Sequence, residues 1–145
     1  MKGILNKAIK FLRALAPQAF SSTAAMTGPE VDTLGADETL WVIDSTTLTG
    51  TTPTVACKVR ECATSGGTFA DVTGATLTIT ETTTDNKVHL LSLNNRGRMR
   101  YQKLVATPAG TGPTGVISAK VLLGENDARA VTQLSTVVAQ TVRVA

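Results

Sequence analysis

The sequence predicts an all-β fold, an antiparallel β-sandwich or jelly-roll-like domain, and three observations support that prediction. Threonine and valine, which are branched at Cβ and therefore favour extended backbone, recur along the whole 145-residue chain. Short apolar segments alternate with clusters of Gly, Pro, Asn and Asp. Several of these segments also have the period of two that is typical of a half-buried strand, as where Leu77 and Ile79 alternate with threonines.

The pattern divides the chain into an arm (residues 1–37), a β-sandwich body (38–124) and a C-terminal part (125–145) that forms an edge strand or a second arm. Only five side chains are aromatic, so the core of the body must be mostly aliphatic. We expect Gly110-Thr111-Gly112-Pro113 to be a flexible hairpin loop. The strands that we expect in the body cover residues 39–44, 54–62, 69–72, 75–82, 87–93, 99–107 and 115–123.

Residues 2–16 have the pattern of an amphipathic helix that ends before Pro17, and an extended connector follows over residues 17–37. Such a short helix is marginal in water, so it needs a surface to lie on. A partner protein, the chain's own body and a membrane surface are the alternatives; we expect a protein partner rather than a membrane. One face of the helix carries the apolar residues Ile4, Leu5, Ala8, Phe11, Leu12 and Leu15.

The formal net charge of +3 is unevenly distributed, because cations gather in the arm and again at residues 96–103. In the second cluster Arg96, Arg98 and Arg100 alternate with other residues, so an extended segment would point all three to one side. Three planar donors in a row suit carboxylates or phosphates. The alternatives are a solvated hairpin tip with ion pairs inside the chain, a contact between subunits, and nucleic acid. The last is disfavoured because interleaved aromatic residues for base stacking are missing.

No pattern of catalytic or metal-binding residues is present, so we expect neither an enzyme nor a cofactor. His89 is the only histidine, and one histidine forms neither a triad nor a metal centre without partners. The glycines match no phosphate-binding motif. Cys57 and Cys62 lie an odd number of residues apart on one expected strand, which places them on opposite faces and predicts free thiols, as in a cytosol. No apolar run is long enough for a membrane-spanning helix.

Residues 66–124 resemble small structural proteins of tailed bacteriophages, several of which are capsid cement or decoration proteins. The resemblance rests on Gly-Gly-Thr-Phe-Ala-Asp-Val-Thr-Gly-Ala at residues 66–75, Leu-Asn-Asn-Arg-Gly-Arg-Met-Arg-Tyr-Gln-Lys-Leu-Val-Ala-Thr at 93–107 and Ser-Ala-Lys-Val-Leu-Leu-Gly at 118–124. The arginine-rich corner followed by Tyr101 is its most specific part. The resemblance implies a non-enzymatic protein of the virion, assembled in the host cytoplasm. The major capsid protein would be its partner, and dimers or trimers its oligomeric state.

The leading hypothesis is therefore a cement protein that stabilises the capsid shell by bridging its subunits. A head–tail or tail component is the second hypothesis, and a non-viral carbohydrate-binding or adhesin-like sandwich is the third. The third is disfavoured because sugar-binding sites expose aromatic side chains, whereas Trp41 lies in the most apolar expected strand. The predicted interface residues are Ile4, Leu5, Ala8, Phe11, Leu12, Leu15, Arg96, Arg98 and Arg100.

Overall fold

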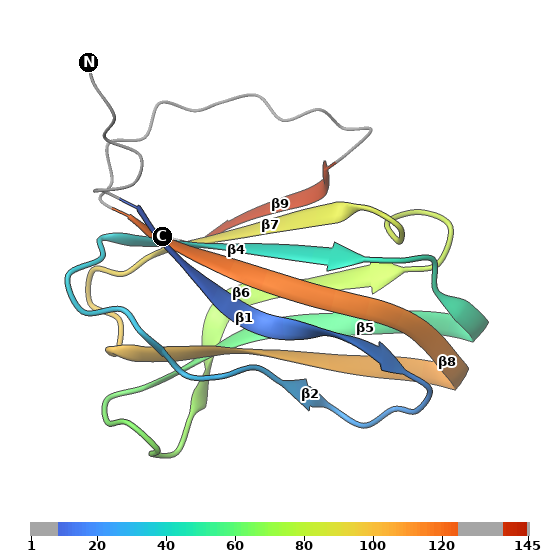
Figure 1. Cartoon of the computed structure of the whole chain (residues 1–145), viewed down its shortest axis with the longest axis horizontal. Helices are drawn as coiled ribbons and strands as arrows, with labels where there is room; N and C mark the ends of the chain where they lie inside the picture. The colour runs from blue at the N-terminus through green and yellow to red at the C-terminus, as the bar shows by residue number, and fades with distance from the viewer. Residues whose placement is uncertain (1–8, 125–137, 145) are drawn as a thin grey trace.

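A computed structural model describes residues 9–124 and 138–144, and its regular elements are all strands. The all-β prediction is therefore confirmed for this part of the chain. The strands pair into one large mixed sheet that nearly closes into a barrel (Figure 1). Their bounds are β1 (Ile9–Phe20), β2 (Met26–Thr27), β3 (Val31–Asp32), β4 (Glu38–Ser45), β5 (Thr49–Cys62), β6 (Ala70–Thr80), β7 (Val88–Asn94), β8 (Tyr101–Gly124) and β9 (Val138–Val144).

The longest strand, β8, joins the two halves of the barrel. Its first half pairs with β5 on one side and with β2 and β3 on the other. Its second half pairs with β4 on one side and with β1 on the other. In Figure 1 the two orange halves of β8 lie in different layers and meet at a bend. Then β6 extends the sheet beyond β5, and β7 and β9 extend it beyond β4.

Two expectations about the sheet need correction. Residues 99–107 and 115–123 were expected to be separate strands, but both belong to β8, and Gly110–Pro113 is a bend within it. The sheet is also not wholly antiparallel, because β9 runs parallel to β7. The formation of β9 agrees with the edge-strand alternative for the C-terminal part, whereas residues 125–137 lie outside the described residues.

The helix expected over residues 2–16 is wrong for residues 9–16, which form the first part of β1; residues 1–8 lie outside the described residues. β8 offers this segment a row of backbone partners, from Ile9 opposite Gly124 onward. Two irregularities in the register then allow consecutive residues, Ala14 and Leu15, to enter the core. Tertiary pairing therefore outweighs a weak local preference for helix. The expected connector is likewise partly strand, since it includes β2 and β3.

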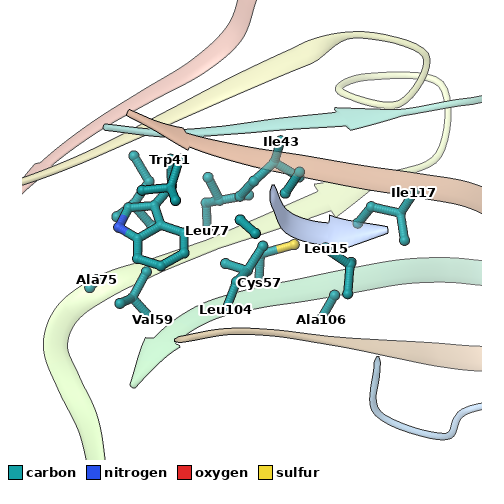
Figure 2. Packing of buried hydrophobic residues seen from close by; sticks show 14 of the residues in the cluster. Leu15, Trp41, Ile43, Cys57, Val59, Ala75, Leu77, Leu104, Ala106 and Ile117 are labelled. Atoms are coloured by element: carbon teal, nitrogen blue, oxygen red, sulfur yellow. The ribbon is translucent and has the colours of Figure 1, made fainter. Parts of the chain in front are cut away.

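The core is mostly aliphatic, with Phe20 and Trp41 as the aromatic members of its main cluster, and it draws on both halves of the barrel. Figure 2 shows Trp41 and Ile43 from β4 packed with Cys57 and Val59 from β5 and with Leu77 from β6. The Trp41 side chain is fully buried, and its indole Nε1 donates to the Thr39 hydroxyl at 3.3 Å. The prediction that Trp41 lies in a buried strand is confirmed.

Both cysteines are free, as the odd spacing predicted, and the structure shows that both are also buried. Cys57 lies in the core, and burial raises the pKa of its thiol to about 12. Cys62 is the last residue of β5. It lies beside Thr64 and Gly67 of the turn that follows, and it does not belong to the main core cluster. The high pKa of Cys57 makes its thiol inert at neutral pH, because the thiolate is the reactive form.

The bend in β8 depends on glycines that have no room for a side chain. A Cβ at Gly110 would lie 2.7 Å from the Thr52 carbonyl oxygen, and one at Gly50 would lie 2.7 Å from the Gly112 carbonyl oxygen. The φ of Gly110 is also +109°, which L-residues rarely adopt. β5 and β8 therefore pair here with their backbones in close approach.

We predict that Gly110→Ala lowers the free energy of unfolding by about 3 kcal/mol or more, because it combines backbone strain with a backbone clash. Gly112→Ala is the matched control. Its φ is +60° and no atom lies within 4 Å of the added Cβ, so only about 1 kcal/mol is expected. Urea unfolding of both variants measures the difference. Equal losses of unfolding free energy in the two variants would show that the close approach of the β5 and β8 backbones does not constrain the bend.

His89 is fully buried on β7, opposite Ile43 of β4, and neither ring nitrogen has a hydrogen-bond partner among the described residues. Burial lowers the pKa of His89 below its ordinary value of 6.5, while the Thr84 backbone and the charge of Asp44 partly oppose this shift and Lys87 adds to it. The folded state therefore holds His89 neutral. Above pH 6.5 His89 is neutral in both the folded and the unfolded chain and costs no stability. As the pH falls below 6.5 the unfolded chain takes up a proton first, so the free energy of unfolding decreases.

We predict that the wild-type protein loses stability between pH 7.5 and pH 5.0 through His89, because the unfolded chain binds a proton at this residue more readily than the folded chain does. His89→Leu should remove that part of the pH dependence. Urea unfolding of both proteins at the two pH values tests this, and the limit of pH 5.0 keeps most carboxyl groups ionised. An identical pH dependence for both proteins would contradict the prediction.

Candidate interaction surfaces

The arginine corner (residues 94–100) is a tight turn that joins β7 to β8. The Arg98 amide donates to the Asn95 carbonyl oxygen at 3.0 Å, and the Arg96 amide donates to Asn94 Oδ1 at 3.0 Å. Gly97 takes a φ of +77°, which suits such a turn. The segment is therefore a turn, as expected of a hairpin tip, and the extended conformation that would align the three arginines is not adopted, because Asn and Gly favour a turn at this point.

Asn95 fixes the corner to the rest of the protein. Its amide donates to the Asp37 carbonyl oxygen at 2.8 Å, and its side-chain Nδ2 donates to the Ala36 carbonyl oxygen at 3.1 Å. Its Oδ1 accepts a bond of 3.0 Å from Nε2 of Gln102. The Thr39 hydroxyl in turn donates to Oε1 of Gln102 at 3.2 Å, and both of these side chains are fully buried. A buried polar network therefore holds the turn in one position.

Arg100 has its counter-charge within the chain. Its Nε and Nη2 donate to the two carboxylate oxygens of Asp32 at 2.8 and 2.7 Å. These bonds, with a further bond from the Leu34 amide, lower the pKa of Asp32 to about 2. The guanidinium also lies 5.1 Å from the centre of the Tyr101 ring. Arg100 therefore agrees with the alternative in which the arginines form ion pairs inside the chain. Because the pair is exposed, solvent screening keeps its contribution to stability small.

Two apolar side chains are exposed beside this ion pair. Leu34 is 72% exposed and Met99 is 44% exposed. The segments that carry them run next to each other, because the Thr33 amide donates to the Arg100 carbonyl oxygen at 2.9 Å. The Met99 amide is itself held by Glu61 Oε2 at 3.1 Å. The corner thus presents apolar side chains from a fixed backbone.

A second candidate surface, the Phe11 patch, lies on the outer face of β1, β8 and β4. Phe11 is 63% exposed and pairs in register with Leu122, which pairs in turn with Leu40. One step along the strands, Arg13 and Lys120 are exposed and directly opposite each other. Neither forms an ion pair with a described residue. Like charges in opposed positions destabilise a sheet, so an anionic partner would relieve this pair.

The structure divides the predicted interface residues of the N-terminal region. Ile4, Leu5 and Ala8 lie outside the described residues. Phe11 is exposed, whereas Leu12 packs against the core and Leu15 is buried in it. Phe11 is therefore accessible to a partner, whereas Leu15 stabilises the core and cannot contact one.

Asp32, Asn95 and Lys120 shape these surfaces but were not predicted from the sequence. Asp32 and Arg100 are 68 positions apart, and no local pattern links them. Lys120 gains its place only because β1 pairs with β8. Asn95 lies in the arginine corner, but most of its hydrogen-bond partners come from other strands and loops.

Comparison with known proteins assigns neither surface, since neither a protein-family model nor a curated protein matches this chain. Within residues 9–124 and 138–144 there is no cluster of three or more potential metal ligands. The same residues contain no helix that is long and apolar enough to cross a membrane.

We predict that Asn95→Ala lowers the free energy of unfolding by about 1 to 3 kcal/mol, because it leaves the buried Gln102 amide without an acceptor. Asn94→Ala is the matched control. It removes only the exposed bond from the Arg96 amide, so the expected loss is below about 1 kcal/mol. Urea unfolding compares the two. If Asn95→Ala were no worse than Asn94→Ala, the network would not anchor the corner.

Proposed function

We propose that this chain is a structural virion protein that binds the capsid shell and stabilises it by bridging capsid subunits. The Phe11 patch is the observation that supports a docking role most directly. It joins an exposed aromatic side chain to two cations on the face of a sheet, Arg13 and Lys120, that have no ion-pair partner in the described part of the chain. Aromatic and arginine side chains dominate the binding energy of protein interfaces, and a rigid sheet loses little entropy on docking.

The partner in this proposal is the major capsid protein. Support comes from the resemblance of residues 66–124 to small virion proteins of tailed phages and from the cationic character of the patch. An acidic and partly apolar surface on the capsid subunit would match it. The free thiols of Cys57 and Cys62 also suit assembly in a reducing host cytoplasm.

The stabilising effect would follow from mass action. A protein that binds the assembled shell, but not the separated subunits, shifts the equilibrium toward the shell. Many copies on a repeating lattice add their individually weak contacts, particularly if each copy reaches two subunits. No reaction is needed for this role, which fits the lack of a catalytic pattern in the sequence.

We predict that Phe11→Ser and Arg13→Glu each weaken binding to capsids at least tenfold, which corresponds to about 1.4 kcal/mol. Val116→Ser is the control, because Val116 is also exposed on β8 but lies outside the patch. Co-sedimentation with particles that lack the protein measures the affinity. Unchanged binding of both patch variants would remove the patch from this role, and binding only at the tail vertex would favour a head–tail component.

Deletion of residues 1–8 separates the N-terminal segment from the patch. A longer deletion to residue 16 would also remove Ala14 and Leu15 from the core, so loss of binding would not be interpretable. The shorter deletion tests Ile4, Leu5 and Ala8 together, and it leaves Phe11 and Arg13 in place.

A further inference from the structure

Two exposed residues of opposite charge, Arg96 of the arginine corner and Asp37 beside it, define a surface at this end of the barrel. Arg96 and Asp37 are both exposed, and neither forms an ion pair with a described residue. They lie close together along the folded backbone, because the Asn95 amide, next to Arg96, donates to the Asp37 carbonyl oxygen at 2.8 Å. The backbone positions of both charged residues are thus fixed relative to each other.

The same end of the barrel exposes Leu34 and Met99, which come from the two segments that Thr33 and Arg100 join. Apolar side chains near charged residues are the usual composition of a protein interface, in which methionine and arginine are enriched. The neighbouring Arg100–Asp32 pair is already neutral overall, so it adds no net charge to this patch.

We propose that two copies of this chain pair corner to corner, with Arg96 of each copy against Asp37 of the other and with Leu34 and Met99 between or beside them. A two-fold interface brings the same patch of both copies together. In such a pair, the charges of Arg96 and Asp37 on one copy can both be matched by the opposite charges of the other copy. A purely acidic partner or a nucleic acid would instead bring negative charge toward Asp37.

The strength of the pairing follows from the size of the patch. Two apolar and two charged side chains per copy bury less surface area than a protein interface of standard size. We therefore expect a dissociation constant of about 1 to 100 μM in solution, a range in which dimers form reversibly. Because the charged pairs lie at the surface, added salt should weaken the dimer.

This inference uses a different surface from the Phe11 patch and does not rest on the proposed function. It is measured on the purified full-length chain in solution, without particles. A failure of capsid binding would leave it unaffected, and a monomeric chain would leave the Phe11 patch unaffected.

Sedimentation equilibrium over a concentration series tests the proposal through a charge swap. We expect Arg96→Glu and Asp37→Arg each to weaken dimerisation at least tenfold, through like-charge contacts across the interface. The double variant, which exchanges the two charges, should return the dissociation constant to within about threefold of wild type, because each swapped pair is again opposite in charge. Leu34→Ser should weaken the dimer without any change in charge.

Lys87→Glu is the control for net charge, because Lys87 precedes β7 at the end of that strand opposite to the corner. Urea unfolding of every variant checks that the barrel is intact. A wild-type chain that stays monomeric at 1 mM would overturn the proposal. Dimerisation that is unchanged in both single-charge variants, or that the double variant fails to restore, would overturn the Arg96–Asp37 contact.

Discussion

The barrel depends on one strand that serves both of its halves. β8 pairs with β5, β2 and β3 before its bend and with β4 and β1 after it, so every other part of the sheet is placed relative to it. β8 can turn so sharply only because its backbone and that of β5 approach closely, with no side chain between them. Gly50 and Gly110 provide this approach in a reciprocal way, since each lies against the segment that carries the other.

Both candidate surfaces are consequences of that arrangement. The arginine corner leads directly into the start of β8, and the Phe11 patch lies over its last residues. β1 reaches the patch as a strand at the margin of the sheet, and its register irregularities and Pro17 interrupt the row of free backbone groups. Such interruptions discourage a further strand from adding to this edge. Binding through the outer face of the sheet therefore fits the structure better than binding through its edge.

The sequence predicted the strands of the body because their environment follows the local pattern. Leu77 and Ile79 are buried and their threonine neighbours Thr76 and Thr78 are exposed, as the period of two requires. The helix prediction failed for residues 9–16 because Leu12 and Leu15 fit a helical spacing as well as a strand with an irregular register. Local preference could not decide between them. The deciding factor was the pairing with β8, which depends on residues more than a hundred positions away.

The bend of β8 and the partners of the arginine corner show a second limit of prediction from the sequence. Gly-Thr-Gly-Pro is an ordinary turn signal, and nothing local distinguishes a hairpin from a bend inside one strand. The partners of Arg100 were equally inaccessible, because Asp32 belongs to a segment expected to be a connector. The sequence could identify a cluster of arginines, but only the fold shows that Arg100 is matched within the chain and that Arg96 forms no ion pair with the residues that the structure describes.

The buried polar network beneath the corner explains how so small a surface could bind at all. Thr39 and Gln102 occupy positions that apolar side chains could fill, and burying polar groups favours folding only when they are hydrogen-bonded. Their bonds reach Asn95 and through it the backbone of Asp37. An apolar core at this point would pack well but would leave the corner without a fixed position. A preorganised corner loses less conformational entropy when it binds, and for a patch with few contacts that saving decides whether association is measurable.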